Sequence, residues 1–344
     1  MSERGPGHLF RVAGGGDAVP IAHGGDLDAA RRMFPEASEP WIDLSTGINP
    51  VPYPCPPLEA SLFRRLPAAA DHAALRRAAA RAYGAADPDC VVPAPGTQIL
   101  IETLPRLVAP TGVAVVGPTY AEHAAAWGRA GHAVSTVPDL SEAGTARVVV
   151  VVNPNNPDGR TWPASALLTC AERLSARGGL LVVDEAFADL EAVESLCPRL
   201  RPGIVVLRSF GKAFGLAGLR LGFAVAGTEI AGAIAAALGP WAVSGAALVI
   251  GRTALDDAPW RAEAAVVRGR DAARLDRMIR RAGGTIVGGT VLFRTADFPD
   301  APGLHRSLGE AGIHVRRFAE APSRLRFGLP ADRAQWCRLS RILR

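Results

Sequence analysis

Five consecutive valines, Val148–Val152, run directly into the polar turn Asn-Pro-Asn-Asn-Pro-Asp-Gly at residues 153–159. A β-branched run without polar alternation is typical of a strand that is buried on both faces of a parallel sheet. Similar apolar runs occur at residues 113–116, 180–183, 204–207 and 221–225, separated by segments rich in alanine, leucine and arginine. The pattern predicts an α/β fold with a mainly parallel, doubly wound sheet in its larger domain.

The order of the predicted elements divides the chain into three parts. Residues 1–40 are rich in glycine and are expected to form an N-terminal arm that belongs to a smaller domain. Residues 41–250 carry the alternating strands and helices of the larger domain. Residues 251–344 are expected to complete a smaller α+β domain, with a helix at 257–282 and short strands at 285–287, 291–294, 314–316 and 324–327.

Two helical segments have recognisable ends. The helix expected over residues 71–83 is followed by Gly84, which can adopt the left-handed conformation that ends many helices. The longest uncharged stretch, residues 231–251, contains Gly239 and Pro240. We therefore expect a buried helix, a break and a second buried helix there, and no association with a membrane.

Composition narrows the classes of function. The 344 residues are 49% hydrophobic with a formal net charge of +5, and paired arginines are not interleaved with aromatic residues. This favours a solvated basic surface over one that binds nucleic acid. The five cysteines are far apart and form no CxxC pair, so neither disulfides nor a metal site are expected. The N-terminal MSERGPGHLF lacks the apolar segment of a signal peptide, and we expect a cytoplasmic protein.

Lys212 is the one lysine among 38 basic residues. Arginine can replace lysine as a surface cation. It cannot replace lysine as a neutral amine nucleophile, because the guanidinium group does not lose its proton in proteins. The retention of a single lysine therefore indicates amine chemistry at this position, although chance survival of a surface lysine is the simpler alternative.

Polar segments follow successive predicted strands. Asn153–Gly159 follows the valine run, Asp184 and Glu185 follow residues 180–183, and Arg208–Lys212 follows residues 204–207. An earlier turn, residues 93–98, begins a helix whose backbone N–H groups could face a phosphate. Because ligands bind at the carboxyl ends of strands in open α/β sheets, we expect one site at this edge.

Four of these motifs, taken in order, resemble a known family. Asn-Pro-Asn-Asn-Pro-Asp-Gly (153–159), Asp-Glu-Ala-Phe (184–187), Ser-Phe-Gly-Lys (209–212) and Gly-Leu-Arg-Leu-Gly (218–222) are similar to the signature of fold-type I pyridoxal-5'-phosphate (PLP) enzymes of the aminotransferase class I/II group. The resemblance covers about residues 20–330. It implies that PLP is the cofactor, that Lys212 forms a Schiff base with it, and that Asp184 keeps the pyridine nitrogen protonated.

The same resemblance implies further contacts. Asn156 would donate to the 3'-oxygen of the ring, and Tyr120 would stack on the ring face. The cofactor phosphate would be held by Gly96, Thr97, Ser209 and Arg220. Arg326, in Arg-Leu-Arg-Phe-Gly, would bind the substrate carboxylate, although an ordinary strand arginine remains the alternative. The residues expected to bind the substrate are Arg326, Asn156 and, from a segment described below, His23.

Two positions depart from the pattern of the related transaminases. Phe187 stands where many of them have tyrosine, so it cannot hydrogen-bond the 3'-oxygen, and tuning of the cofactor rests more on Asn156. Arg65-Leu66-Pro67 stands where histidinol-phosphate aminotransferases carry Arg-Tyr-Pro, whose tyrosine reaches the neighbouring subunit's cofactor phosphate. Tyr53 is a candidate replacement for that missing donor.

The N-terminal segments narrow the reaction. His23-Gly24-Gly25-Asp26, the run Ile42–Pro50 and Gly-Pro-Trp-Ala-Val-Ser at 239–244 resemble L-threonine-O-3-phosphate decarboxylases of cobalamin biosynthesis. The resemblance implies a lyase that converts L-threonine O-3-phosphate to 1-aminopropan-2-ol O-2-phosphate, and so a small phosphorylated amino acid as substrate. His23, Arg32 and Arg294 are candidates for binding the substrate phosphate.

Three alternatives stay open. The same residues would serve a PLP-dependent aminotransferase of a phosphorylated substrate, of the histidinol-phosphate type. Ser209-x-x-Lys212 also matches the SxxK pattern of serine enzymes, although the chain has no SDN or KTG motif. A non-catalytic protein with the same fold is the third. By analogy with the family, we expect a homodimer.

Overall fold

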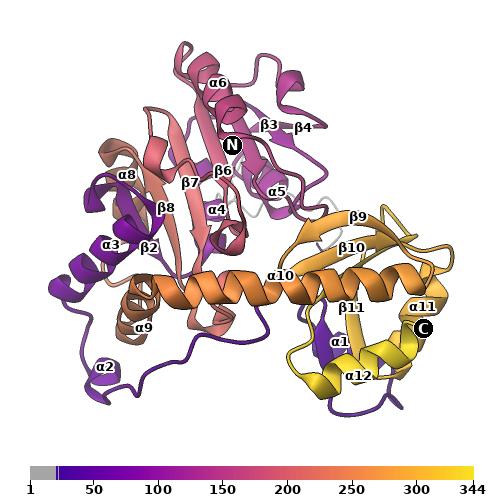
Figure 1. Ribbon diagram of the computed structural model, residues 1–344. Helices are drawn as coiled ribbons and strands as arrows, with labels where there is room; N and C mark the ends of the chain where they lie inside the picture. The colour runs from indigo at the N-terminus through magenta and orange to yellow at the C-terminus, as the bar shows by residue number, and fades with distance from the viewer. Residues whose placement is uncertain (1–20, 22) are drawn as a thin grey trace, which may run out of the picture.

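The computed structural model describes residues 21 and 23–344, which form two β-sheets with their helices (Figure 1). Within these residues the larger sheet has seven strands in the spatial order β2-β8-β7-β6-β5-β3-β4. They are β2 (Val91–Ala94), β3 (Gly112–Val116), β4 (Ala133–Val137), β5 (Val148–Val152), β6 (Leu180–Asp184), β7 (Ile204–Ser209) and β8 (Gly222–Ala226). Strands β3 to β7 are mutually parallel, and β8 is antiparallel to β7 and β2. The expected α/β class is confirmed.

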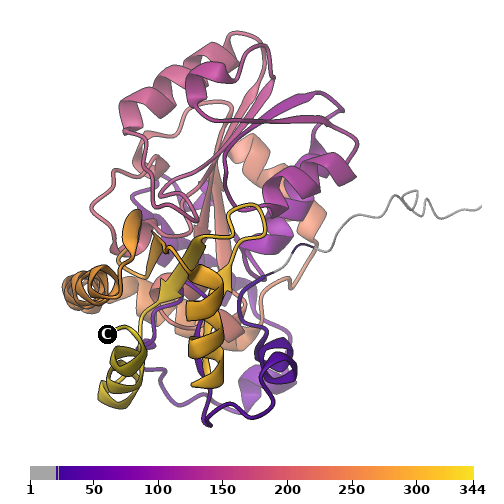
Figure 2. The same cartoon turned by 90° about the vertical axis from the view of Figure 1, so that its right-hand side faces the viewer.

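The valine run shows why this sheet is buried on both faces. Val149 and Val151 belong to one hydrophobic cluster, while Val148 and Val150 belong to another on the opposite face. Successive side chains of a strand point to opposite faces, so an uninterrupted apolar run is needed. Figure 2 shows helices on both sides of these strands. One face packs on α3 (Ala69–Tyr83), α6 (Ala164–Ser175) and α9 (Gly245–Asp256), and the other on α4 (Thr97–Thr103), α5 (Glu122–Arg129) and α8 (Thr228–Leu238).

The smaller sheet has the order β1-β11-β12-β10-β9 in the described residues. Its strands are β1 (Ile42–Leu44), β9 (Thr285–Thr290), β10 (Phe293–Asp297), β11 (Ile313–Arg317) and β12 (Arg324–Gly328). Helices α1 (Leu27–Met33), α11 (Ala301–Glu310) and α12 (Arg333–Ile342) accompany it. Helix α10 (Ala258–Arg281) runs from beside α9 to beneath this sheet and so spans both parts of the molecule (Figure 1).

Short elements complete the chain, and most lie in loops around the larger sheet. They are α2 (Ser61–Arg64), α7 (Phe210–Ala213), and the 3-10 turns η1 (Pro88–Cys90), η2 (Leu104–Leu107), η3 (Leu140–Glu142), η4 (Ala188–Leu190), η5 (Cys197–Arg199) and η6 (Ala217–Leu219).

The structure corrects three expectations about the elements. Strand β1 pairs in parallel with β11, so a segment assigned to the larger domain belongs to the smaller sheet. We retain the division into arm, larger and smaller domain as a proposal, with β1 in the smaller one. Helix α8 has only Ala231 and Ile234 buried, so it is a surface helix and not the expected buried one. Strand β10 begins at Phe293 and not at Val291. Val291 belongs to the turn between β9 and β10, where its backbone N–H donates to the side chain of Glu191.

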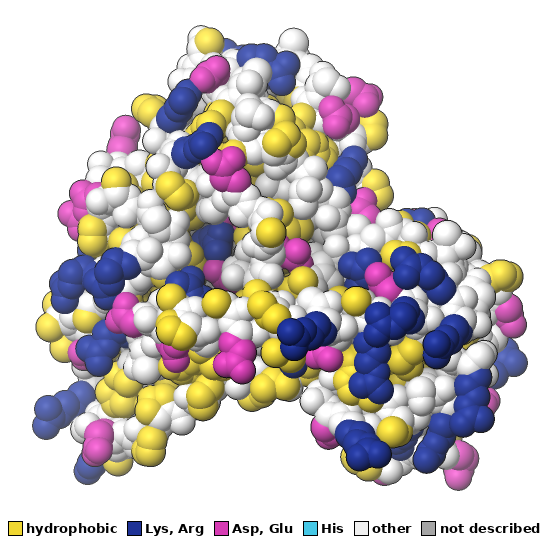
Figure 3. Space-filling model, in the orientation of Figure 1, with side chains coloured by type: hydrophobic (Ala, Val, Ile, Leu, Met, Phe, Trp, Pro, Cys, Tyr) yellow, Lys and Arg dark blue, Asp and Glu magenta, His cyan; other side chains and the backbone are white. Residues whose placement is uncertain are grey.

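Other expectations agree with the structure. Helix α3 ends at Tyr83, and Gly84 follows with φ 75°. None of the helices in the described part of the chain combines the length and apolar character needed to cross a membrane. The N-terminal ten residues, on which the expected absence of a signal peptide rests, lie outside the described residues. Figure 3 shows basic side chains mixed with acidic ones over the larger domain and more densely placed over the smaller domain.

Candidate active site

The carboxyl ends of β5, β6 and β7 open onto a cavity of about 170 Å³. The structure brings the predicted cofactor-binding residues together around it. They are Gly96, Thr97, Tyr120, Asn156, Asp184, Ser209, Lys212 and Arg220. Because adjacent parallel strands end at the same edge of a sheet, segments more than a hundred residues apart converge here. Their individual roles remain predictions.

One end of the cavity is suited to a phosphate monoester. A Cβ atom added to Gly96 would lie 2.6 Å from Nη2 of Arg220, and one added to Gly222 would lie 2.6 Å from the backbone N of Thr97. The two glycines therefore let the arginine and the first turn of α4 approach closely. Arg220 itself has φ 55°, a left-handed conformation that costs a residue with a side chain about 1–3 kcal/mol. A guanidinium group beside the hydroxyls of Thr97 and Ser209 fits the phosphate of PLP.

Lys212 lies in α7, immediately after β7, and faces the same cavity. Burial, and next the positive charge of Arg326, lower the pKa of its amine to about 8, against the opposing effect of Asp184. Its backbone is fixed by the run at residues 42–50, because the N–H of Asn49 donates to the carbonyl of Lys212 at 2.9 Å. The side-chain amide of Asn49 donates to the carbonyl of Ala213 at 2.9 Å. A buried amine with a lowered pKa suits covalent attachment of an aldehyde.

Asp184 ends β6 and is almost fully buried. Its Oδ2 lies 2.9 Å from Nε2 of His123, and its Oδ1 accepts from the N–H of Ala186 at 2.9 Å. These contacts fix the carboxylate at the floor of the cavity, where it can face a pyridine nitrogen. Sequence reasoning missed His123, which lies in the first turn of α5, three residues after Tyr120.

A second cavity of about 260 Å³ adjoins the first and shares Tyr120, Asn156, Phe187 and Lys212 with it. Arg326 lines this cavity and donates to Oδ1 of Asn156 and, at 2.7 Å, to the carbonyl of Ser45. With its oxygen accepting from Arg326, the amide of Asn156 has its N–H groups left for the cofactor ring. Burial, and next the charge of Arg316, lower the pKa of Arg326 to about 10, which favours an anionic ligand beside it.

The N-terminal arm reaches this second cavity. His23 lines it and pairs with Glu122, Nε2 to Oε1, at 2.9 Å. A Cβ atom on Gly24 would lie 2.4 Å from the carbonyl oxygen of Ser45, and the N–H of Gly25 donates to Oγ of Ser45 at 2.7 Å. The glycines after His23 thus allow the close approach that the sequence suggested.

Arg316 also lines the second cavity, and sequence reasoning did not select it. It lies on β11, and the antiparallel pairing of β11 with β12 brings it beside Arg326. The register places the two arginines opposite each other.

The structure places two candidates for the substrate phosphate outside both cavities. Arg294 forms a two-point ion pair with Asp276 of α10, Nε to Oδ1 at 2.6 Å and Nη2 to Oδ2 at 3.0 Å, outside both cavities. Arg32 is an exposed residue of α1 that lines neither cavity. Both are ordinary structural or surface arginines.

The suggestion that Tyr53 replaces the missing tyrosine donor stays a prediction, because that donor would reach the cofactor phosphate of a neighbouring subunit. The hydroxyl of Tyr53 donates to Asp257 at 3.2 Å, and its ring packs edge-on against Phe214 and Trp260, away from the cavity. Leu66 is 67% exposed and does not reach the cavity either. Phe187 does line it, with its ring centroid 5.5 Å from Nζ of Lys212. It supplies an apolar wall at the point where a tyrosine would supply a hydroxyl.

The fold and this site together define a class of protein. The family model described as aminotransferase class I and II matches residues 42–335, and the chain belongs to this family. Among curated proteins, it is 42% identical to a threonine-phosphate decarboxylase of Pseudomonas aeruginosa, over 94% of this chain and 97% of that protein. It is 45% identical to one from Sinorhizobium sp., over 95% and 98% of the respective chains.

More distant relatives include the histidinol-phosphate aminotransferase of Syntrophotalea carbinolica, 34% identical over 58% of this chain and 61% of that protein. Two solved structures share the fold. The histidinol-phosphate aminotransferase of Sinorhizobium meliloti in complex with PLP has a TM-score of 0.76 at 22% identity, over 95% of this chain and 94% of that one. The L-threonine-O-3-phosphate decarboxylase of Porphyromonas gingivalis has a TM-score of 0.71 at 20% identity, over 83% and 94%.

Proposed function

We propose that this protein is a PLP-dependent carboxy-lyase that converts L-threonine O-3-phosphate to 1-aminopropan-2-ol O-2-phosphate and CO2 in cobalamin biosynthesis. The observation that carries the proposal is the 42% and 45% identity to two threonine-phosphate decarboxylases over nearly the whole chain. The geometry supports it, since the segments at residues 23–26 and 42–50 that resemble these decarboxylases contact the candidate site.

The described residues can perform the steps of this reaction. PLP, when bound, supplies an electron-accepting ring that stabilises the electron pair left at Cα as CO2 departs. Asp184, fixed by His123 and the N–H of Ala186, holds a proton at the ring nitrogen. Arg326 and Asn156 orient the substrate carboxylate, and Lys212 moves a proton to Cα after CO2 has left. Phe187 and Tyr120 line both cavities beside Lys212.

The second cavity suits a substrate with two anionic groups. Arg326 and Arg316 both line it, and His23 lies at its edge. We assign the carboxylate to Arg326 and the substrate phosphate to Arg316 with His23, because a phosphate dianion is best matched by more than one cationic or donor group. Glu320 lines the same cavity and would disfavour a third acidic group on the substrate.

The decisive experiment measures products. The purified protein reconstituted with PLP is incubated with L-threonine O-3-phosphate, and CO2 and the aminopropanol phosphate are quantified. Stoichiometric release of CO2 without an added α-keto acid supports the proposal. Amino transfer to an α-keto acid without release of CO2 would instead establish the second candidate, a histidinol-phosphate type aminotransferase, which the 34% identity to such an enzyme favours.

Replacing Arg326 with alanine is expected to raise KM for L-threonine O-3-phosphate about 10- to 100-fold, the effect of losing one charge-assisted contact. PLP binding should change little, because the guanidinium lines the second cavity and not the first. Steady-state kinetics with the PLP-saturated protein provide the test. Arg324→Ala is the matched control, since Arg324 pairs with Asp297 outside both cavities. A KM equal to that of the control would remove Arg326 from the substrate site.

The pKa of Lys212 predicts a pH dependence for cofactor attachment. Only the neutral amine attacks an aldehyde, and the amine becomes neutral as the pH rises through about 8. The rate of PLP attachment to the apoprotein should therefore rise with pH, with its midpoint at about pH 8. Arg326→Ala should move this midpoint upward, because the arginine lowers the pKa of Lys212. Stopped-flow absorbance across this pH range tests both statements, and an unmoved midpoint in the variant contradicts the second.

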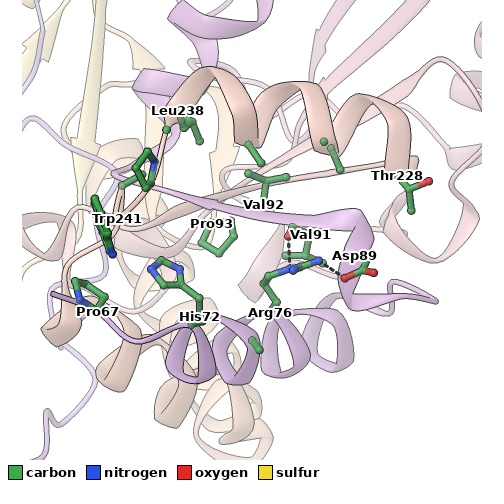
Figure 4. A pocket seen from close by; sticks show the side chains of 18 residues that line it. Pro67, His72, Arg76, Asp89, Val91, Val92, Pro93, Thr228, Leu238 and Trp241 are labelled. Atoms are coloured by element: carbon green, nitrogen blue, oxygen red, sulfur yellow. Dashed lines mark hydrogen bonds and ion pairs between the residues drawn. The ribbon is translucent and has the colours of Figure 1, made fainter.

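We further propose that the protein is a cytoplasmic homodimer. A separate cavity of about 690 Å³ lies between α3 and α8 and is bordered by Pro67, His72, Arg76 and Trp241 (Figure 4). Trp241 is 55% exposed with φ 56°, and the nearby chain exposes Phe63 and Leu66. Large apolar side chains grouped on a surface are typical of protein interfaces. Sedimentation of the wild type and of Trp241→Ser tests this, with a monomeric wild type as the contrary result.

A further inference from the structure

A cluster of three charged side chains lies buried behind the candidate active site. Nη1 of Arg208 donates to Oε2 of Glu185 at 2.5 Å, and its Nη2 donates to Oδ1 of Asp189. The side chains are 5%, 1% and 1% exposed, respectively. The guanidinium also lies over the ring of Tyr83, 4.5 Å from its centroid. None of these groups lines either cavity of the site.

The cluster lies on the opposite face of the sheet from the cofactor floor. Tyr83 belongs to α3, whereas His123, the partner of Asp184, belongs to α5. These helices cover opposite faces of the larger sheet. Since side chains alternate along a strand, Glu185 points away from the face that Asp184 occupies, and Arg208 away from that of Ser209.

Each member of the ion pair is the chain neighbour of a site residue. Glu185 follows Asp184 at the end of β6. Arg208 precedes Ser209 at the end of β7, and Lys212 of α7 follows Ser209 by three residues. Asp184 is opposite Leu207 in the ladder, and the N–H of Glu185 donates to the carbonyl of Leu207 at 2.9 Å. The Glu185–Arg208 pair thus bridges the two strands at the level where one presents the carboxylate and the other leads to the amine.

The contact between Arg208 and Asp189 holds the turn that follows β6. Asp189 lies in η4, two residues beyond Phe187, which lines both cavities. Glu185 also accepts from the N–H of Leu196 at 2.8 Å and from the hydroxyl of Ser195 at 2.6 Å. Arg208 therefore ties the turn that carries Phe187 to the strand that leads to Lys212.

Stability alone does not account for such a cluster. Buried charges lose their hydration, and well-packed apolar side chains of similar volume are often equally or more stabilising. The hydrogen bonding of the cluster is also incomplete. Three of its buried atoms have no hydrogen-bond partner among the described residues: Nε of Arg208, Oδ2 of Asp189 and the hydroxyl oxygen of Tyr83. What the charged cluster does supply is directional, two-point geometry between three chain segments.

We propose that Arg208, paired with Glu185 and Asp189, is a positioning residue that sets the spacing between Asp184 and Lys212 and holds the turn of Phe187. The cofactor must reach both residues at once, so this spacing decides how well the ring nitrogen meets Asp184 while the aldehyde meets the amine. The inference rests on the proposed function, because it concerns the alignment of PLP.

The first test is Arg208→Lys, which keeps the charge but loses the two-point fork. Arg324→Lys is the matched control, because Arg324 forms a two-point pair with Asp297, 2.9 Å for both contacts, and lines neither cavity. We expect Arg208→Lys to lower kcat about 10- to 100-fold, as small misplacements of reacting groups do. The pH midpoint of the visible absorbance of the PLP-loaded protein should shift as well. Values of kcat and midpoint equal to those of the control overturn the proposal.

The second test separates positioning from stability. Arg208→Met, Glu185→Gln and Asp189→Asn are combined, so that no charge is left unpaired, and thermal unfolding is measured beside PLP affinity and the absorbance midpoint. If positioning is the role, the triple variant regains thermal stability relative to Arg208→Met but keeps a shifted midpoint and weakened PLP binding. Recovery of the wild-type midpoint and affinity along with stability would show a merely structural cluster. If the triple variant does not fold, Arg208→Lys decides the question.

Failure of this proposal is distinguishable from failure of the proposed function. A wild-type protein that binds no PLP would refute the function without reference to Arg208. A wild type that binds PLP and releases CO2, with Arg208 variants indistinguishable from the control, would refute only the positioning role.

Discussion

Replacing Lys212 with arginine is expected to reduce release of CO2 from L-threonine O-3-phosphate by at least about 10⁴-fold, since both covalent attachment and proton transfer are lost. Arginine keeps the positive charge and much of the length of the side chain, but its guanidinium does not become a neutral nucleophile. The buried amine is replaced in a cavity already lined by Arg220, so some loss of stability is also expected.

Borohydride reduction of the PLP-loaded proteins, followed by mass spectrometry, measures attachment independently of turnover. The wild type should carry the reduced cofactor on the peptide that contains Lys212, and Lys212→Arg should carry none. Because the chain has no other lysine, no second side-chain amine can compensate, which makes the experiment unusually clean. Circular dichroism shows whether the variant is folded. Turnover within tenfold of the wild type in a folded Lys212→Arg protein would refute the assignment of the nucleophile.

Replacing Asp184 with asparagine is expected to lower kcat about 10²- to 10³-fold, the loss typical of removing one preorganised electrostatic contact at a reacting group. The amide is similar in shape to the carboxylate and can still contact His123, so the fold and PLP attachment should persist. Only the negative charge that holds a proton at the ring nitrogen is lost. The effect should therefore appear in kcat and leave borohydride labelling at Lys212 intact.

Asp139→Asn is the control for this substitution. Asp139 caps a surface turn by accepting from the N–H of Ser141 at 3.0 Å and contacts neither cavity. Asp184, in contrast, is only 4% exposed and lines the first cavity. A folded Asp184→Asn protein with kcat equal to that of Asp139→Asn would show that the carboxylate does not support the electron-accepting ring.

Much of the cofactor site could be predicted from the sequence, and the reason is chemical. Lys212 is unique as an amine, and the polar segments after the apolar runs at residues 148–152, 180–183 and 204–207 must meet at one edge of a parallel sheet. The run of five valines likewise indicates a strand buried on both sides, since alternating valines pack into the hydrophobic clusters on the two faces of the sheet. These features depend on residue type and local order, both of which the sequence contains.

The arginines show what the sequence could not decide. Arg326 stands in the motif Arg-Leu-Arg-Phe-Gly, but nothing in the neighbours of Arg32, Arg294 and Arg316 shows which of these three lines the second cavity. The register of β11 against β12 places Arg316 opposite Arg326, whereas Arg294 is directed to Asp276. The same holds for Tyr53, which Asp257 and two aromatic rings hold away from the cavity.

By itself, the amino-acid sequence determined the fold class, because continuous apolar runs alternate with helical segments. It also indicated the amine and, through the family resemblance, the acid that we propose to serve the cofactor. The tertiary structure decided which of many equivalent cations line the second cavity, that β1 joins the smaller sheet, and that Arg208 bridges β6 and β7 behind the site. Those outcomes depend on long-range pairing and packing, which bring together residues whose separation along the chain carries no signal.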